Sequence, residues 1–332
     1  MKTASLHDYI ARLIRSLGKL VPLALDQWDE KAIHDARVAT RRLKSVLSLL
    51  APALSSDRTK QLKKTTRKLR RRLGALRDAD VMLGHLQELS VQQPSDLAIQ
   101  WVQGRLMQER EELREKCRQK LSASRVMANL TRAKPLEEQV QELGTVPARL
   151  LSEQLPTQLA EFSEQAGHLV RAVAGGNHAA QVKDPHALRI ATKALRYTLE
   201  LAPAAGFPLP STVLKSLKQM QDALGLWHDY VVLGERILRL TLDSGVPYHD
   251  PALYEGLLDL SRLVSRRAQR QLHRFVSLWK ERGLQLRQDI CGAFCIALPL
   301  AADTSVESAS PEVPRETLPG STCRSDGQER SI

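Results

Sequence analysis

Two distant stretches of the chain repeat one spacing of basic and titratable residues. The first is IHDARVATRRLK, residues 33–44, and the second is PHALRIATKALR, residues 185–196. In each stretch a histidine is followed by cations three, seven and ten positions later, which gives His34, Arg37, Arg41 and Lys44, and then His186, Arg189, Lys193 and Arg196. Guanidinium, ammonium and imidazole groups donate hydrogen bonds and carry positive charge, so the chemistry they suit is the binding of anions such as phosphates.

The spacing places these residues on one face of a helix. At about 100° per residue, the four positions lie within an arc of roughly 80°. Apolar or small residues occupy the other side of both stretches, namely Leu43, Val46 and Leu50 in the first and Leu195, Thr198 and Ala202 in the second. Each stretch therefore predicts an amphipathic helix with an apolar back and a cationic front.

The elements that must position these residues are predicted to be helices throughout. The chain has 332 residues, of which 42% are hydrophobic and only 4% aromatic, so it can bury a sizeable core and favours helices over strands. Apolar residues three or four positions apart predict helices over 6–25, from about Asp29 or Glu30 to Pro52, and over 57–89, 95–121, 159–173 and 250–290. The second motif helix is expected to begin with Asp184 as its N-cap and Pro185 at its first position.

The repeat extends beyond the motif helices. LGALRD at 73–78 matches LGLWHD at 224–229, and Lys64 and Arg67 fall on Lys215 and Lys218. The pattern predicts internal duplication of a four-helix unit. We expect an N-terminal half at 1–128, a connector rich in breaks and acids at 129–156, a C-terminal half at 157–292, and a disordered tail rich in Ser, Pro, Thr and Glu at 293–332.

Positive charge is concentrated in one part of the chain. The net charge is +12, and residues 34–78 alone hold 14 Lys and Arg residues against three acids, a net charge of +11. A solvated helical surface normally mixes both signs, so this surplus suggests a polyanionic partner. The two copies also differ: Asp222 stands at the position of Arg71, so the cationic surface should be weighted toward the first half.

Other chemistries find little support in the sequence. Four cysteines in a chain of this size do not form a disulfide framework and suit a reducing cytoplasm. Cys291 and Cys295 have no second ligand pair, so no metal site is expected.

Charges interrupt the apolar residues near the N-terminus, and no run reaches the roughly 18 apolar residues of a membrane span. The chain contains no GxxxxGK[ST], GxSxG or HExxH motif, so we expect no catalytic residues and no cofactor.

Both motif helices and both LG-containing helices resemble the conserved histidine α-helical domain family, abbreviated CHAD, over roughly residues 6–290. The resemblance implies an all-α fold of two pseudo-symmetric four-helix bundles with a basic central cleft or pore that binds inorganic polyphosphate. The residues that it implies as the polyphosphate site are His34, Arg37, Arg41, Arg42, Lys44, Lys64, Arg67, Arg71, His186, Arg189, Lys193, Arg196, Lys215 and Lys218.

The function expected from this resemblance is non-catalytic binding of inorganic polyphosphate by a cytoplasmic protein associated with polyphosphate granules. Two alternatives stay open: binding of nucleic acid or another polyanion, and service as an accessory protein to a phosphate-processing enzyme. Asp78 and Asp229 are expected to brace nearby Arg or His side chains rather than to form a catalytic acid pair, and Tyr197 and Trp227 are expected to lie in the bundle core.

Overall fold

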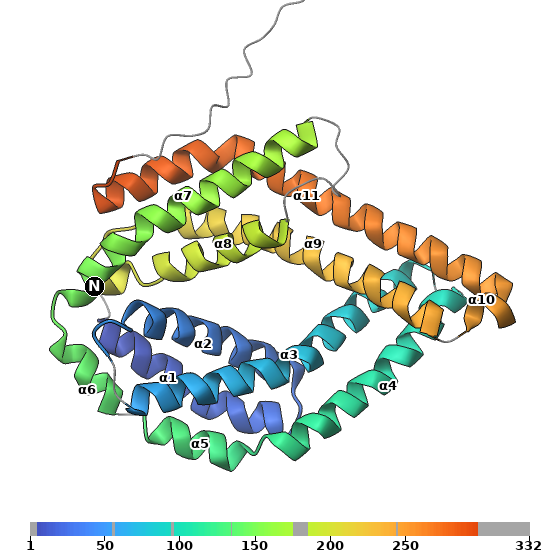
Figure 1. The fold of residues 1–332 in the computed structure, drawn as a ribbon, viewed down its shortest axis with the longest axis horizontal. Coiled ribbons are helices and arrows are strands. Elements are labelled where there is room, and N and C mark those ends of the chain that lie inside the picture. Colours follow the sequence, from blue (N-terminus) through green and yellow to red (C-terminus); the bar gives the residue numbers. More distant parts are fainter. Residues whose placement is uncertain are drawn as a thin grey trace, which may run out of the picture.

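The computed structural model describes residues 5–54, 57–93, 96–133, 135–174, 185–243 and 245–297, and Figure 1 shows its ribbon. All regular structure within these residues is helical, with no strand, which confirms the predicted all-α class. The helices are α1 (Leu6–Leu25), α2 (Glu30–Leu49), α3 (Asp57–Gln92), α4 (Leu97–Lys120), α5 (Ala123–Thr131), α6 (Pro135–Glu142), α7 (Val146–Ala174), α8 (Pro185–Leu199), a 3₁₀ turn (Pro203–Ala205), α9 (Ser211–Asp243), α10 (Val246–His249) and α11 (Pro251–Phe294).

Short polar side chains fix where several of these helices begin. Ser5 and Asp8 form a capping box at the start of α1, and the Asp29 carboxylate accepts a 2.6 Å hydrogen bond from the Ala32 amide at the start of α2. Such caps satisfy backbone N–H groups that have no partner within the helix. The predicted start of the first motif helix is thereby confirmed, whereas the predicted cap of the second, Asp184, lies outside the described residues.

The helices form two groups that face one another. In Figure 1, α1, α2, α3 and α4 make the blue and cyan group, while α7, α8, α9 and α11 make the green, yellow and orange group. Within the groups α1 packs on α2, α2 on α3, α7 on α8, and α9 along most of α11. The groups meet where α2 contacts α8, where α3 contacts α9, and where α4 contacts α9 and α11. The two motif helices, α2 and α8, therefore lie side by side at the centre of the molecule.

The segment expected to be a connector, residues 129–156, is largely helical. It contains the end of α5, all of α6, and the first part of α7. Helix α7 begins at Val146, earlier than the expected start at Leu159, and it includes Pro156. Leu151, Leu155 and Leu159 are all fully buried, and this continuous apolar stripe supports the helix across the proline, whose missing N–H removes only one backbone hydrogen bond.

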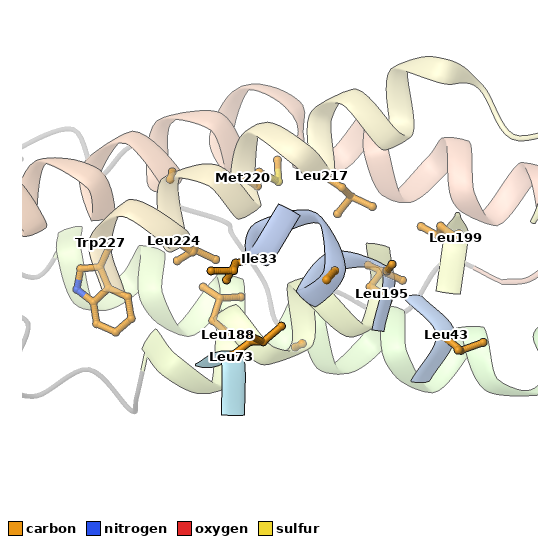
Figure 2. Close-up of a cluster of buried hydrophobic side chains, with 14 of the residues drawn as sticks. Ile33, Leu43, Leu73, Leu188, Leu195, Leu199, Leu217, Met220, Leu224 and Trp227 are labelled. Carbon is orange, nitrogen blue, oxygen red and sulfur yellow. The ribbon is translucent and has the colours of Figure 1, made fainter. Parts of the chain in front are cut away.

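One continuous apolar core joins both groups of helices. Figure 2 shows part of it, with Ile33 and Leu73 from the first group near Leu188 and Leu224 from the second. Tyr197 and Trp227 are also buried, as predicted. None of the helices in the described residues is long and apolar enough to cross a membrane. Because the apolar faces of α2 and α8 are buried in the core, their cationic faces point toward the space between the two groups of helices.

Candidate functional site

A cleft of about 570 Å³ lies between the two groups of helices. Its walls come from α2, α3, α8 and α9, with one residue from α11. Six Lys or Arg residues and two histidines line it against three aspartates, and none of its lining residues is Phe, Tyr or Trp. The ionisable lining residues are His34, Arg37, Arg41, Arg77, Asp78, Arg189, Lys193, Asp222, His228, Asp229 and Arg274.

Arg37 is the most closely held cation of the first wall. Its side chain is only 11% exposed, its Nη1 donates to the Arg70 carbonyl at 3.3 Å, and its Nη2 lies 3.6 Å from Asp78 Oδ1. Burial, together with the neighbouring cation Arg41, lowers the pKa of Arg37 to about 10 even though Asp78 opposes the shift. The guanidinium is still charged at neutral pH, so it presents a fixed positive group to the cleft. The expected bracing role of Asp78 matches this geometry.

Gly74 makes this position of Arg37 possible. A Cβ at residue 74 would lie 2.7 Å from Arg37 Nη1, which is closer than such atoms approach. The glycine at the matching place in the second half, Gly225, has nothing within 4 Å of a Cβ. The glycine of the repeated LG pair thus allows a close side-chain approach only in the first half.

In the second wall, Lys193 is surrounded by like charges. Burial lowers its pKa to about 7, with further lowering by Arg189 and Arg41, although Asp229 opposes the shift. Burial also raises the pKa of Asp229, despite the nearby Arg189. Positive charge is therefore poorly compensated here when no anion is present. A bound anion would favour the protonated form of Lys193, because an opposite charge stabilises an ammonium group.

The histidines lie at the margin of this cationic surface. Burial, followed by Arg77, lowers the pKa of His34. The rings of His186 and His228 lie 5.3 Å apart between centroids, and burial together with Arg189 lowers the pKa of His228 to about 4. Neutral imidazoles next to arginines can donate hydrogen bonds to an anion without adding to the repulsion.

Two of the predicted site residues are paired with an acid instead of facing the cleft. Arg42 Nε and Arg196 Nη1 contact the two oxygens of Glu200 at 2.8 and 2.6 Å, and Arg196 Nε also donates to the Gln221 amide oxygen at 2.8 Å. Neither arginine lines the cleft. Glu200 follows α8 and is only 12% exposed at its side chain, so it holds α2 and α8 together rather than leaving either arginine to a ligand.

The remaining predicted cations also lie outside the lining of the cleft. All of them are exposed. For those on α3 the reason is geometric, because the part of α3 that reaches the cleft is that of Arg77, Asp78 and Val81, further along the helix. The predicted site residues that lie outside the cleft lining and are exposed are Lys44, Lys64, Arg67, Arg71, Lys215 and Lys218. Lys64 instead lines a separate groove between α3 and α5. His186, which is half-buried, does not line the cleft itself, but its ring lies beside that of His228, which does.

Three cations of the site were not predicted. Arg77 and Arg274 line the cleft, and Arg70 lies behind Arg37, where its Nη1 donates to the Thr40 carbonyl at 3.4 Å. Arg77 stands within the repeated LGALRD segment, so the repeat itself was the signal that could have found it. Arg274 is on α11, whose sequence gives no indication of which exposed cation turns toward the cleft.

The arrangement suits binding of a phosphate-rich anion. Guanidinium forks and an ammonium group converge from two walls, as recognition of phosphate oxygens requires. In the described residues, no group of three or more His, Cys, Asp or Glu side chains is placed to hold a metal ion.

Comparison with known proteins identifies the fold and the family. The sequence model of the CHAD domain family matches residues 8–238. The crystal structure of the CHAD domain from the plant Ricinus communis is similar to this chain with a TM-score of 0.52 and 21% sequence identity, covering 90% of this chain and 94% of that one. No curated protein matches the sequence. The family is known for binding polyphosphate, and the family match over most of the helical region shows that this chain belongs to the CHAD domain family.

Proposed function

We propose that this protein binds inorganic polyphosphate in the cleft between its two groups of helices. The observation that carries the proposal is the lining of the cleft: six Lys or Arg residues drawn from α2, α3, α8 and α11, against three aspartates. Polyphosphate carries negative charge along its whole length, so a site with donors on two facing walls can hold several phosphates at once.

The composition of the cleft favours an inorganic chain over a nucleic acid. Binding of single-stranded nucleic acid relies on aromatic side chains on which bases stack, and the cleft lining contains none. Recognition by charge and hydrogen bonding alone matches a ligand that has phosphates and no bases. RNA is therefore the competitor that tests the proposal.

We propose that binding is not accompanied by catalysis. Phosphoryl transfer usually needs carboxylates that hold Mg²⁺ beside the phosphates, whereas Asp78 approaches Arg37 and Asp229 lies in the field of Arg189 and Lys193. A binder of this kind would associate with polyphosphate granules, or would present the polymer to a phosphate-processing enzyme.

The test is direct measurement of affinity. Long-chain polyphosphate should bind the wild type at moderate salt, and an excess of single-stranded RNA should not displace it. Arg41→Gln combined with Lys193→Gln should weaken binding by at least about tenfold, because each lost charge-assisted hydrogen bond costs roughly 1.5–3 kcal/mol.

Arg239→Gln combined with Lys280→Gln is the matched control. Both residues are exposed, on α9 and α11, and neither lines the cleft. The control removes the same charge and should bind within about twofold of the wild type, with helicity checked by circular dichroism for both variants. Equal losses in the two variants, or displacement by RNA, would show a general electrostatic surface and overturn the proposal.

A further inference from the structure

A second basic groove lies beside α3, about a quarter to a third of a turn around the helix from Gly74. It has a volume of about 150 Å³ and is formed by α3, the end of α4 and α5. Its lining residues include four cations and no acid, and we call it the outer groove. The cations of the outer groove are Lys64, Lys68, Lys120 and Arg125.

In the part of the chain that the structure describes, no acid lines the outer groove. All four cations are exposed, and within the described residues none of them forms an ion pair. Neighbouring cations on α4 behave differently, since Lys116 pairs with Glu112 at 3.4 Å and Arg118 with Glu115 at 2.7 Å. A surface helix ordinarily offers such partners, whereas the outer groove gathers four exposed cations with no acid among its lining residues.

The backbone around the outer groove adds to its positive character. Helix α4 ends at Lys120, and Ser122 then caps α5, where its hydroxyl accepts a 3.4 Å hydrogen bond from the Arg125 amide. Leu121 and Ser122 line the groove, so the positive end of the α5 dipole lies beside it. Val126, the next residue along α5, is buried in the core, which anchors the backbone of Arg125 beside the groove.

A strip of exposed arginines on α3 connects the outer groove to the cleft. Gly74 on α3 faces Arg37 in the cleft. At about 100° per residue, the angles around the helix axis measured from Gly74 are roughly 20° and 60° for Arg67 and Arg71, and roughly 80° and 120° for Lys64 and Lys68. Arg67 and Arg71 are exposed, and the electrostatic influence of Arg67 and Arg41 on Arg70 places this strip next to the cleft wall. From Gly74 to Lys64 the helix rises about 15 Å.

We propose that the outer groove is a second phosphate-binding subsite, and that a long polyphosphate chain held in the cleft runs over Arg67 and Arg71 into it. This inference rests on the proposed function of the cleft. It assigns a role to cations that the cleft does not use, and it makes binding dependent on chain length, because only a chain long enough to cross the strip can occupy both places. Two linked subsites on one ligand raise the affinity by their effective concentration.

The experiment compares tripolyphosphate, which is too short to cross the strip, with long-chain polyphosphate. Lys68→Glu combined with Arg125→Glu alters the outer groove, and Arg239→Glu combined with Lys280→Glu is the control with the same charge change at exposed positions outside both sites. The groove variant should bind long-chain polyphosphate at least about tenfold more weakly than the wild type. Its affinity for tripolyphosphate should change by less than about twofold, and the control should lose less than about threefold for either ligand.

Several outcomes would overturn the inference. Equal losses of long-chain affinity in the groove variant and the control would leave only long-range electrostatics, and an unchanged long-chain affinity would leave the groove without a role. If Arg41→Gln combined with Lys193→Gln still bound long chains through the groove, the two sites would be independent rather than joined. Failure of the wild type to bind either ligand would instead refute the proposed function of the cleft. A groove variant that lost binding only to single-stranded RNA would assign the groove to nucleic acid.

Discussion

At the scale of single residues, Gly74 controls the position of Arg37, a cleft cation whose side chain is only 11% exposed. Gly74→Ala should displace the Arg37 guanidinium, since the new Cβ would lie 2.7 Å from Nη1, and should break its hydrogen bond to the Arg70 carbonyl. We expect the affinity for tripolyphosphate to fall about five- to tenfold, equivalent to roughly 1–1.4 kcal/mol, as measured by isothermal titration calorimetry.

Gly84→Ala is the control for this substitution. Gly84 is exposed on the same helix, and a Cβ there meets nothing within 4 Å. Both alanines should favour the helix by about 0.5–1 kcal/mol relative to glycine, but only Gly74→Ala should weaken binding. Unchanged affinity in Gly74→Ala would show that Arg37 has room to move without loss of the ligand.

Lys193 should couple anion binding to proton uptake. Its pKa in the free protein is about 7, lowered by burial and then by Arg189 and Arg41, and a bound polyanion should raise it. Between about pH 7 and the raised pKa, the bound state therefore holds more protons than the free state, and affinity should decrease as the pH rises through that interval. Calorimetry in buffers of different ionisation enthalpy measures the uptake.

Lys193→Arg tests the source of these protons. Arginine remains protonated at about pH 8, so this variant should keep affinity at that pH while its proton uptake falls. Any uptake that remains would come from His34 and His228, whose pKa values are also lowered in the free protein. The same uptake in wild type and variant would exclude Lys193 as the titrating group.

At the scale of helices, periodicity was enough to predict α2 and α8 and their cationic fronts. Five of the eight predicted motif residues line the cleft, and these are His34, Arg37, Arg41, Arg189 and Lys193. Periodicity does not reveal which partner a side chain meets on a neighbouring helix. Arg42 and Arg196 pair with Glu200, and the repeat gave no sign of this acid, because residue 48, its counterpart in the first half, is serine.

The prediction for α3 shows the same limit, because the sequence pattern does not say which surface each cation reaches. A cationic line along a long helix identifies a charged face, but only the packing of α3 against α5 and α9 decides which cations reach which surface. Arg77 therefore lines the cleft while Lys64 lines the outer groove. The predicted internal duplication of a four-helix unit remains a prediction from the sequence repeat. At one pair of matching positions, Gly74 and Gly225, the surroundings of the two glycines differ.

Glu200 should stabilise the contact between α2 and α8. Its carboxylate contacts Arg42 and Arg196, so Glu200→Gln would leave two guanidiniums close together with a neutral partner. We expect a loss of about 1–3 kcal/mol in the free energy of unfolding, less than for a fully buried ion pair because Arg42 is 37% exposed. Chemical denaturation measures it.

Glu235→Gln removes an exposed acid on α9 as the control and should change stability by less than about 0.5 kcal/mol. A Glu200→Gln variant as stable as this control would mean that the Arg42 contact carries no net stabilisation and that α2 and α8 are held by their apolar faces alone.

At the scale of the whole molecule, side-chain contacts between residues outside the cleft lining join the two groups of helices. Arg236 on α9 contacts Glu109 on α4 at 2.6 Å, and the rings of His85 on α3 and Tyr230 on α9 lie 4.6 Å apart. With the shared apolar core, these contacts hold the walls of the cleft in place although the walls carry like charges. The fold therefore maintains a repulsive surface that only an anion can neutralise.

This balance predicts opposite effects of salt on the free and bound protein. Sodium chloride should raise the melting temperature of the free protein by screening repulsion between the cleft walls. Tripolyphosphate at about a hundredfold excess over its dissociation constant should add about 2.7 kcal/mol, or several degrees. At a fixed tripolyphosphate concentration, that increment should shrink as salt rises, because counterion release weakens binding. Scanning calorimetry across a salt series measures both effects. An increment independent of salt would mean that hydrogen-bond geometry, rather than the unneutralised charge of the cleft, drives binding.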